Sequence, residues 1–503
     1  MIGRTAILAS AALLLAGCAA THGPFDSHLA SEAQPVRACA EWFQALEAEI
    51  DAGGVRDAQD ARVRGFPYLR VDRALAALAP KAAQDWNALH ALADRMTGLD
   101  LAARRAEIAN LPEERVRALP GLVLDAQRGE AASRTRECAR LLREIDFSKP
   151  ASSRLVLARA TVPDDYSSAS RFFGIYALSR IPFAAGVRRW EAETLASFER
   201  RRLGQVAPGQ VRIRIAPPAS PVLGHSGVAG ILAGAARNPL GIPEPTAQDR
   251  ELLLAAHAPS FEIDVAGDAD RFGRLHWVAG APSPAVDATF PTVYARISHA
   301  VYRGRVLLQL VYTIWFPERP PQANGDIYAG RLDGVTWRVT LAEDGEPVLF
   351  DSIHPCGCYH LFFPTPRART IPSPGGLQEW AFSPTALPRV QPGERALLRI
   401  ASGTHYLEGV EMVRGLDSLA RYTLASDEDL RSLPLPGGGR RSIFGPDGLV
   451  PGTEREERDL FWPMGIASAG AMRQWGRHAT AFVGRRHFDD ADLVERRFIL
   501  EPP

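Results

Sequence analysis

Two thiols and two imidazoles alternate along one short stretch of the sequence. His354, Cys356, Cys358 and His360 occupy every second position of His-Pro-Cys-Gly-Cys-Tyr-His. Side chains alternate across an extended chain, so all four would point the same way on a β-strand. Thiolate and imidazole ligands suit zinc and copper, and two thiols can instead form a disulfide. No other stretch of the chain has a comparable density of such groups.

The backbone of this stretch decides which chemistry is open to it. On a straight strand, His354 and His360 would lie roughly 20 Å apart, too far to share one tetrahedral ion. Gly357 permits a bend, after which both thiols and one or both imidazoles could hold zinc or copper. Two alternatives stay open. Cys356 and Cys358 could close a small, strained disulfide that exchanges easily, or form a purely structural staple beside histidines that only hydrogen-bond.

Other polar residues could approach the stretch from elsewhere in the chain. His299 and His405 are additional candidate ligands, although a lone histidine on an apolar face is more often part of a core. Asp351 could orient one of the imidazoles from behind. Asp333 is assigned to a turn, because Asp333-Gly334 between two apolar runs is a strong hairpin signal.

A β pattern dominates residues 261–430, which contain the thiol stretch. Thr292–Tyr302 alternates apolar and polar residues, and Arg305–Phe316 is rich in β-branched and aromatic residues after a short Arg-Gly turn. Residues 347–353 continue the pattern and run directly into the stretch. We therefore expect a large, mainly antiparallel β domain, built as a sandwich or a barrel.

Helical periodicity dominates the preceding region, residues 36–150. Cys39 begins one apolar face that continues through Trp42, and Cys138 lies on another near the end of the region. A disulfide between Cys39 and Cys138 would tie the first helix of a bundle to its last, and we predict this pairing. The fold class expected for the chain is thus α+β, with an N-terminal helical bundle followed by the β domain.

Two further regions complete the expected organisation. Residues 151–260 are expected to hold a helical passage, from about Tyr166 to Arg202, and then a Pro- and Gly-rich connector. That helix is basic and apolar, as membrane-surface helices are, but its interspersed acidic residues favour packing between domains. Residues 431–503 are expected to form a C-terminal extension packed on the β domain.

The first residues resemble the signal sequence of bacterial lipoproteins. Arg4 supplies a positive charge, a short apolar run follows, and Leu15-Ala16-Gly17-Cys18 resembles a lipobox. The resemblance implies that residues 1–17 are a signal peptide, that Cys18 is acylated, and that residues 18–35 form a lipidated tether. The residue after the cysteine is Ala19, which in this pattern favours the outer membrane, with the body facing the periplasm.

Composition agrees with a folded body in the cell envelope. The chain has 503 residues and a formal net charge of zero, so no overall field recruits nucleic acid. Two functional hypotheses follow. The protein is an envelope lipoprotein with a thiol/imidazole metal site, structural or catalytic; alternatively, it is a non-enzymatic binding or assembly lipoprotein in which Cys356 and Cys358 form a disulfide. No recognisable motif identifies a reaction, or a binding partner other than the membrane itself.

Overall fold

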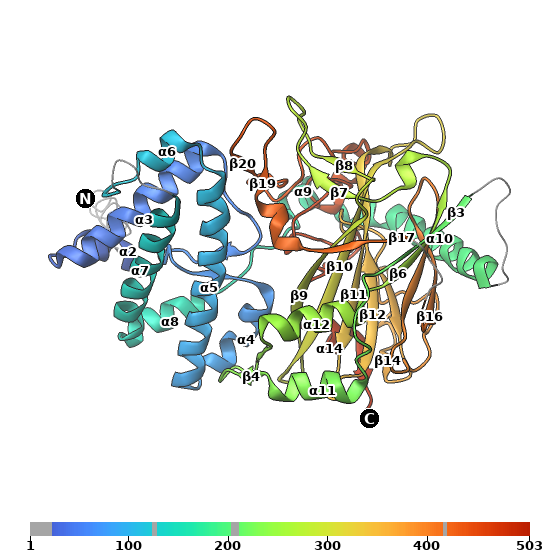
Figure 1. Ribbon diagram of the computed structural model, residues 1–503, viewed down its shortest axis with the longest axis horizontal. Coiled ribbons are helices and arrows are strands. Elements are labelled where there is room, and N and C mark those ends of the chain that lie inside the picture. Colours follow the sequence, from blue (N-terminus) through green and yellow to red (C-terminus); the bar gives the residue numbers. More distant parts are fainter. Residues whose placement is uncertain (1–22, 123–127, 203–210, 416–419, 503) are drawn as a thin grey trace, which may run out of the picture.

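The computed structural model describes residues 23–122, 128–202, 211–415 and 420–502. Helices make up the N-terminal half and strands most of the C-terminal half, so the predicted α+β class is confirmed (Figure 1). The predicted signal peptide, Cys18 and the beginning of the predicted tether lie outside the described residues. Among the described residues, no helix is both long enough and apolar enough to cross a bilayer.

Residues 24–159 form a helical bundle around one apolar core, and this bundle is the helical half of the molecule. Asp72 and Asp85 cap the N-termini of two of its helices by accepting hydrogen bonds from Leu75 N and Ala88 N. Trp42 is fully buried, as the periodicity predicted, whereas Cys39 at the start of the same face is partly buried. The helices are α2 (Pro24–Leu29), α3 (Gln34–Gly53), α4 (Arg73–Ala82), α5 (Trp86–Asn110), α6 (Glu113–Arg117), α7 (Arg128–Phe147) and α8 (Pro150–Arg159).

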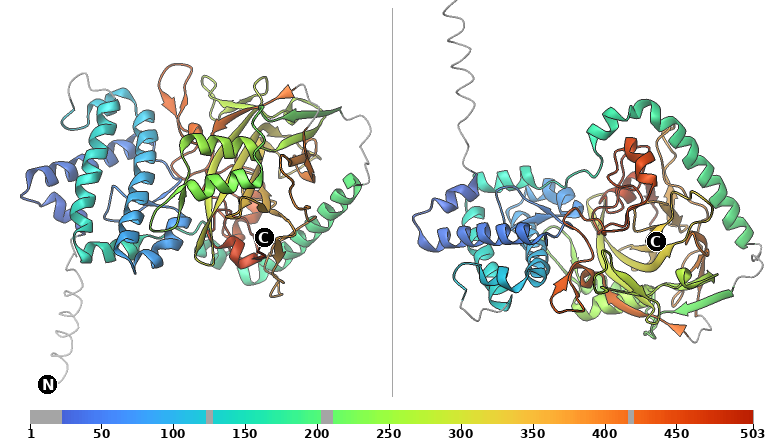
Figure 2. Two further views of the ribbon diagram at one scale, coloured as in Figure 1. Left: turned by 60° about the horizontal axis from the view of Figure 1, so that its bottom comes forward. Right: turned by 90° about the horizontal axis from the view of Figure 1, so that it is seen from above.

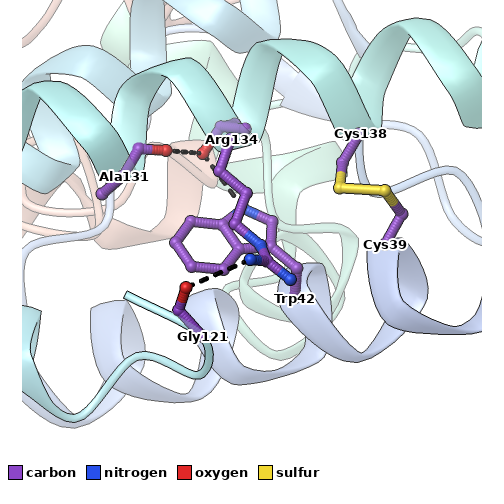
Figure 3. Close-up of a disulfide and its surroundings, with 7 residues drawn as sticks. Cys39, Trp42, Gly121, Ala131, Arg134 and Cys138 are labelled. Carbon is purple, nitrogen blue, oxygen red and sulfur yellow. Dashed lines mark hydrogen bonds between the residues drawn. A yellow bond between two sulfur atoms is a disulfide. The ribbon is translucent and has the colours of Figure 1, made fainter. Parts of the chain in front are cut away.

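The predicted disulfide links the first long helix of the bundle to a later one. Cys39 on α3 is bonded to Cys138 on α7, which confirms the pairing. Figure 3 shows the bridge beside Trp42, whose ring lies under the guanidinium of Arg134 and whose Nε1 donates to Thr135 Oγ1. The bridge therefore sits at the edge of the bundle core, where two helices already pack together.

The expected tether, residues 18–35, is partly folded, which corrects that expectation. Residues 24–29 form α2, and Phe25 packs against the bundle core. The imidazole of His28 lies 2.9 Å from the carboxylate of Asp146, which also accepts a hydrogen bond from Tyr68. The sequence of this segment is short and polar and indicated no structure. The residues that hold it lie on helices far along the chain, so local sequence could not reveal them.

Two sheets form the β half and enclose a shared apolar core. The predicted hairpin of β9 and β10 is confirmed, with Tyr302 paired to Arg305 across the turn. The six-stranded sheet has the order β13 (Leu361–Pro364), β12 (Pro347–Ile353), β11 (Gly330–Leu341), β10 (Arg305–Arg319), β9 (Thr292–Tyr302), β18 (Thr423–Ser426). The five-stranded sheet has the order β16 (Leu407–Val413), β15 (Arg395–Ile400), β6 (Ser260–Val265), β3 (Val211–Ala216), β17 (Ala420–Arg421). Most neighbouring strands are antiparallel; β18 on β9, β15 on β6 and β17 on β3 are parallel.

The predicted turn at Asp333-Gly334 is wrong. Both residues lie inside the continuous strand β11, opposite Phe316 and Trp315 of β10. The register is the same on both sides of the one gap in this pairing, since Phe316 pairs with Asp333 and Glu318 with Arg331. The gap falls at Pro317, which has no amide hydrogen to donate, opposite Leu332, which has a positive φ of 52°. Gly334 is required because a Cβ there would lie 2.3 Å from the carbonyl oxygen of Ile314.

The remaining segments surround the β half. The region expected to be a connector contributes β3 to a sheet and covers the β half with helices, while α10 runs along its outside (Figure 2). The helical elements are α9 (Ser168–Phe173), α10 (Tyr176–Arg202), α11 (His225–Gly234), α12 (Ala247–His257), η2 (Asp268–Asp270), η3 (Asp427–Arg431), α13 (Glu457–Phe461), η4 (Trp462–Met464) and α14 (Leu493–Arg497). The short strand pairs are β1 (Ala61–Arg62) with β2 (Arg70–Val71), β4 (Ala236–Arg237) with β5 (Pro243–Glu244), β7 (Arg274–His276) with β8 (Ala285–Asp287), β14 (Ala368–Thr370) with β21 (Phe498–Leu500), and β19 (Leu433–Pro434) with β20 (Arg440–Arg441).

The C-terminal segment packs on the β half and also joins it to the bundle. Arg431 Nε donates to Asp57 Oδ2 at 2.9 Å, and Asn110 Nδ2 donates to the carbonyl of Arg431 at 2.8 Å. A second contact joins Arg73 of α4 to Asp489 at 3.0 Å. The segment therefore does more than was predicted for residues 431–503, because it holds the two halves together.

Candidate functional site

The thiol stretch leaves the sheet and forms a tight turn. Strand β12 ends at Ile353; the amide of Gly357 then donates to the carbonyl of His354 at 2.7 Å, and the amide of His354 donates to that of Cys358 at 3.0 Å. Gly357 has a φ of +91°, and a Cβ there would lie 2.4 Å from the carbonyl oxygen of Ala479. The bend that Gly357 permits is therefore present, and an extended stretch with four side chains on one face is not.

One imidazole of the stretch is held by Asp333 from the neighbouring strand. His354 Nδ1 lies 3.0 Å from Asp333 Oδ1, and His405 Nδ1 lies 3.0 Å from the other oxygen of that carboxylate. Burial alone would raise the pKa of Asp333, but His354, Arg455 and the hydrogen bonds of both imidazoles hold it well below its usual range. His405, predicted only as an additional candidate, is thus joined to His354 through a shared carboxylate.

The pKa values of the two imidazoles on Asp333 shift in opposite directions. Burial lowers the pKa of His354 below its usual range, against the opposing effect of Asp333. Burial also opposes the charged form of His405, but hydrogen bonds to Asp270 and Asp333 raise its pKa. The Nε2 atom of His354 is buried and has no hydrogen-bond partner among the described residues.

The other imidazole of the stretch is held by a separate carboxylate. His360 Nε2 lies 2.9 Å from Asp351 Oδ2, so the expectation that Asp351 orients an imidazole is confirmed. Arg338 binds the same carboxylate through two nitrogens. Burial lowers the pKa of His360 to about 3, so the ring is neutral, and its Nδ1 is buried without a partner among the described residues.

Both cysteines of the stretch are free thiols, in unequal surroundings. Cys356 is buried in an apolar cluster that includes Leu275 and Trp315, whereas Cys358 is only half-buried. The amide of Cys358 donates to Cys356 Sγ at 3.4 Å, which keeps the pair together. A hydrogen bond from the Cys358 thiol lowers the pKa of Cys356, and the same bond together with burial raises the pKa of Cys358.

Cys358 opens onto an aromatic cleft of about 530 Å³. One wall is α10, where Trp190 packs on Tyr359 at a centroid distance of 5.5 Å and on Phe382 at 5.6 Å. The C-terminal segment forms another part of the lining, where Phe461 contacts Phe183 of α10. His360 also lines this cleft. Apart from Tyr359 of the stretch itself, the aromatic lining residues come from segments that only the fold brings together, and none of them was predicted as a site residue.

A carboxyl group lies in the same cleft. Glu457, at the start of α13, is 3% exposed, and burial raises its pKa to about 7 despite the opposing charge of Arg455 and Arg319. Its charge acts on both thiols of the stretch. The cleft therefore combines an apolar lining with a thiol pair and a carboxyl group that titrates near neutral pH.

The four tentative metal ligands are not gathered around one point. His354 and His360 are turned to different carboxylates, and Cys358 and His360 line the cleft while Cys356 faces the core. Within the described part of the chain, no group of three or more His, Cys, Asp or Glu side chains is placed to hold a metal ion. In each imidazole, however, the nitrogen that does not face the carboxylate has no hydrogen-bond partner among the described residues. In metal sites, a histidine binds the metal through one ring nitrogen and a carboxylate through the other.

His299, the other additional candidate, belongs to a different place. It lines a second, polar cleft of about 640 Å³, together with Asp60 and Arg73 of the helical half and Arg296. Burial lowers the pKa of His299 to about 3. It is not part of the thiol site.

Comparisons with known proteins define no family for this chain. No family model matches it, and neither the curated proteins nor the solved structures include a match. Function must therefore be argued from the thiol site and its cleft.

Proposed function

We propose that this protein is a lipid-anchored envelope protein that binds an apolar ligand or protein segment in the aromatic cleft, where Cys356 and Cys358 act as an exchanging thiol pair. The observation that carries this proposal is the position of the pair: Cys358 opens onto the cleft, while Cys356 stands behind it. Both neighbouring imidazoles are held by carboxylates, which leaves the thiols as the reactive groups.

The anchoring part of the proposal rests on the first residues of the sequence. The charged start, the short apolar run and Leu15-Ala16-Gly17-Cys18 favour acylation of Cys18 and export to the envelope. More than one acyl chain gives stable attachment, where a single chain does not. The Cys39–Cys138 disulfide fits a compartment that permits disulfides.

The exchange reaction can be written with its electrons balanced. The Cys358 thiol passes its proton to the Cys356 sulfur, to which it is hydrogen-bonded, and attacks one sulfur of a disulfide in the bound partner, which forms a mixed disulfide and releases one partner thiolate. Cys356 then gives that proton to the released thiolate and attacks Cys358 Sγ. This closes the Cys356–Cys358 disulfide and releases the second partner sulfur, which takes a proton from water. Two electrons pass to the partner. The ring of a pair two residues apart is strained, which favours the reverse direction, in which the closed pair oxidises a dithiol.

A second candidate function is a metal site at the same place. It is favoured by the unpartnered nitrogens of His354 and His360, each opposite a carboxylate that would orient it. Neutral imidazoles and thiolates are suitable ligands for zinc or copper, and that ion would supply Lewis acidity or a redox centre. The side chains would have to move to share an ion, so this candidate ranks second.

One experiment separates the two candidates. The protein is purified without chelator, and metal content is measured together with free thiols before and after equilibration in glutathione buffers of graded redox potential. We expect no stoichiometric metal, and two thiols that oxidise reversibly as a unit and are absent from a Cys356→Ser, Cys358→Ser variant. About one equivalent of zinc or copper, lost in that variant, would instead establish the metal site. Thiols that never exchange would contradict the first candidate.

A further inference from the structure

A group of large apolar side chains is exposed at the start of the helix that walls the cleft. Five such residues of α9, α10 and the joint between them are between 51% and 78% exposed. Scattered single apolar residues are ordinary on a surface, but a contiguous patch of this kind marks an interaction site. The five residues are Phe172, Phe173, Ile175, Leu178 and Ile181.

The patch is held in place and extends onto a second segment. Gly174 lies so close to η4 that a Cβ there would meet Cβ of Pro463 at 2.5 Å. Arg171 fixes α9 by donating to the carbonyls of Met464 and Gly484 at 2.8 and 2.6 Å. Beside this contact, Leu460 and Trp462 are themselves exposed. The apolar side chains are therefore displayed on a braced surface, and we call these seven residues the apolar rim.

Charge and position indicate what the apolar rim contacts. Residues 167–190 contain four arginines and no acidic residue, and Arg180 and Arg188 are exposed on α10, where they can contact anionic headgroups. The exposed acidic residues near the rim, Glu454, Glu456 and Asp459, belong to its other segment, beside Leu460. In the right-hand view of Figure 2, α2, at the start of the described chain, lies on the same side of the molecule as α9 and α10. An anchor at Cys18 precedes α2 by only a few residues, so it would bring this side of the body to the membrane.

We propose that the apolar rim lies in the headgroup region of an anionic bilayer, with its leucines, isoleucines and aromatic rings inserted and Arg180 at the phosphates. The rim adjoins the cleft, since Pro182 and Phe183 line the cleft directly after Ile181 in the sequence, and Phe461 lines it next to Leu460. The mouth of the cleft then faces the membrane surface. The acylated Cys18 of the proposed function serves here only to bring the body close to the membrane. Insertion of the apolar rim can therefore be tested separately from acylation.

The test places a photo-crosslinking amino acid at Leu178 in the full chain, with Val222 as the matched control. Val222 is equally apolar and 76% exposed, but it lies outside the rim. On vesicles of phosphatidylethanolamine and phosphatidylglycerol, we expect lipid adducts at position 178 about tenfold above position 222, and a decrease in pure phosphatidylcholine.

Three results would overturn the proposal: equal lipid adducts at both positions, adducts at 178 only to a second copy of the chain, or adducts at 178 only to another protein. Labelling cells with an alkyne-bearing fatty acid tests the anchor independently. Wild-type protein without the label would contradict acylation at Cys18. Label on the wild type and none on Cys18→Ser, with lipid adducts at 178 still formed by that variant on added vesicles, would support both proposals.

Discussion

Cys356 and Cys358 are two residues apart and have different access to solvent, which sets their order of reaction. Under native conditions we expect one thiol to be alkylated quickly and the other only on unfolding, because Cys356 is buried among apolar side chains. Mass spectrometry of peptides after a brief maleimide pulse checks this. The fast phase should vanish in Cys358→Ser and persist in Cys356→Ser. Equal labelling of both thiols would contradict the described cleft.

Glu457 makes stability depend on pH near neutrality. Its pKa is raised to about 7 in the folded state from an ordinary 4.5, so the unfolded chain ionises first and stability falls as pH rises through this window. We expect a loss of about 3 kcal/mol between about pH 5 and pH 8 that is absent in Glu457→Gln. Urea unfolding at both pH values measures it. Glu456→Gln, at an exposed neighbouring position, should keep the loss.

Residue types alone predicted part of the thiol site. The thiols, the imidazoles and the carboxylate behind His360 were identified because they are close in sequence. Asp333 was missed because Asp-Gly is a turn signal, whereas here both residues lie within a continuous strand where Gly334 lets the carbonyl of Ile314 approach closely. Trp190 and Glu457 were missed because their relation to Cys358 exists only after distant segments have packed.

At the scale of elements, the turn after β12 depends on Gly357. Its positive φ and its close approach to Ala479 leave no room for a side chain, so Gly357→Ala should lower the free energy of unfolding by about 2 to 4 kcal/mol. Gly98, inside α5 with open space around it, provides the control. Gly98→Ala should stabilise by about 0.5 to 1 kcal/mol. Denaturant unfolding of both variants measures this difference. Equal effects of the two substitutions would contradict the special role of Gly357.

The disulfide constrains the helical bundle across 99 residues of sequence. Replacing both cysteines, Cys39→Ser and Cys138→Ser, should destabilise the bundle by about 4 to 5 kcal/mol, chiefly because the unfolded chain gains conformational freedom. Thermal unfolding followed by circular dichroism measures the effect. Reduction of the wild-type protein should reproduce it, and an unchanged midpoint after reduction would show that the bridge adds nothing to bundle stability.

Periodicity predicted whole elements better than their ends. The long helices and the β9–β10 hairpin follow from apolar spacing that burial enforces over many residues. The continuity of β11 through Asp333-Gly334 and the helix at residues 24–29 did not follow, because each depends on remote residues. Gly334 is required by the carbonyl of Ile314 on β10, and His28 contacts the carboxylate of Asp146 on α7.

At the scale of the whole molecule, buried ion pairs join the two halves. Asp57→Ala would leave the buried guanidinium of Arg431 with Glu428, which is partly exposed, as its carboxylate partner, so we expect a loss of about 2 to 4 kcal/mol. Asp51→Ala removes an exposed pair with Arg56 in the same region and should cost less than about 1 kcal/mol. Urea unfolding of both variants decides the point. Similar small losses would mean that the halves are held mainly by other contacts.

Composition and pattern predicted the order of the two halves but not how they are joined. The helical and β patterns separate cleanly along the chain, since each depends on local spacing. The joining residues are single arginines and carboxylates without any periodic signal, and Arg431 acquires its role only through Asp57 and Asn110 of the other half.

Several residues that line the cleft come late in the chain, among them Phe461, Ala479 and Arg486. They are therefore synthesised after the thiol pair. The chain emerges N-terminus first, so Cys356 and Cys358 are made before the residues that cover them. During that interval they are open to mispairing. Cys39 and Cys138 are complete much earlier, and a bundle that has already closed its own bridge offers the later thiols no wrong partner.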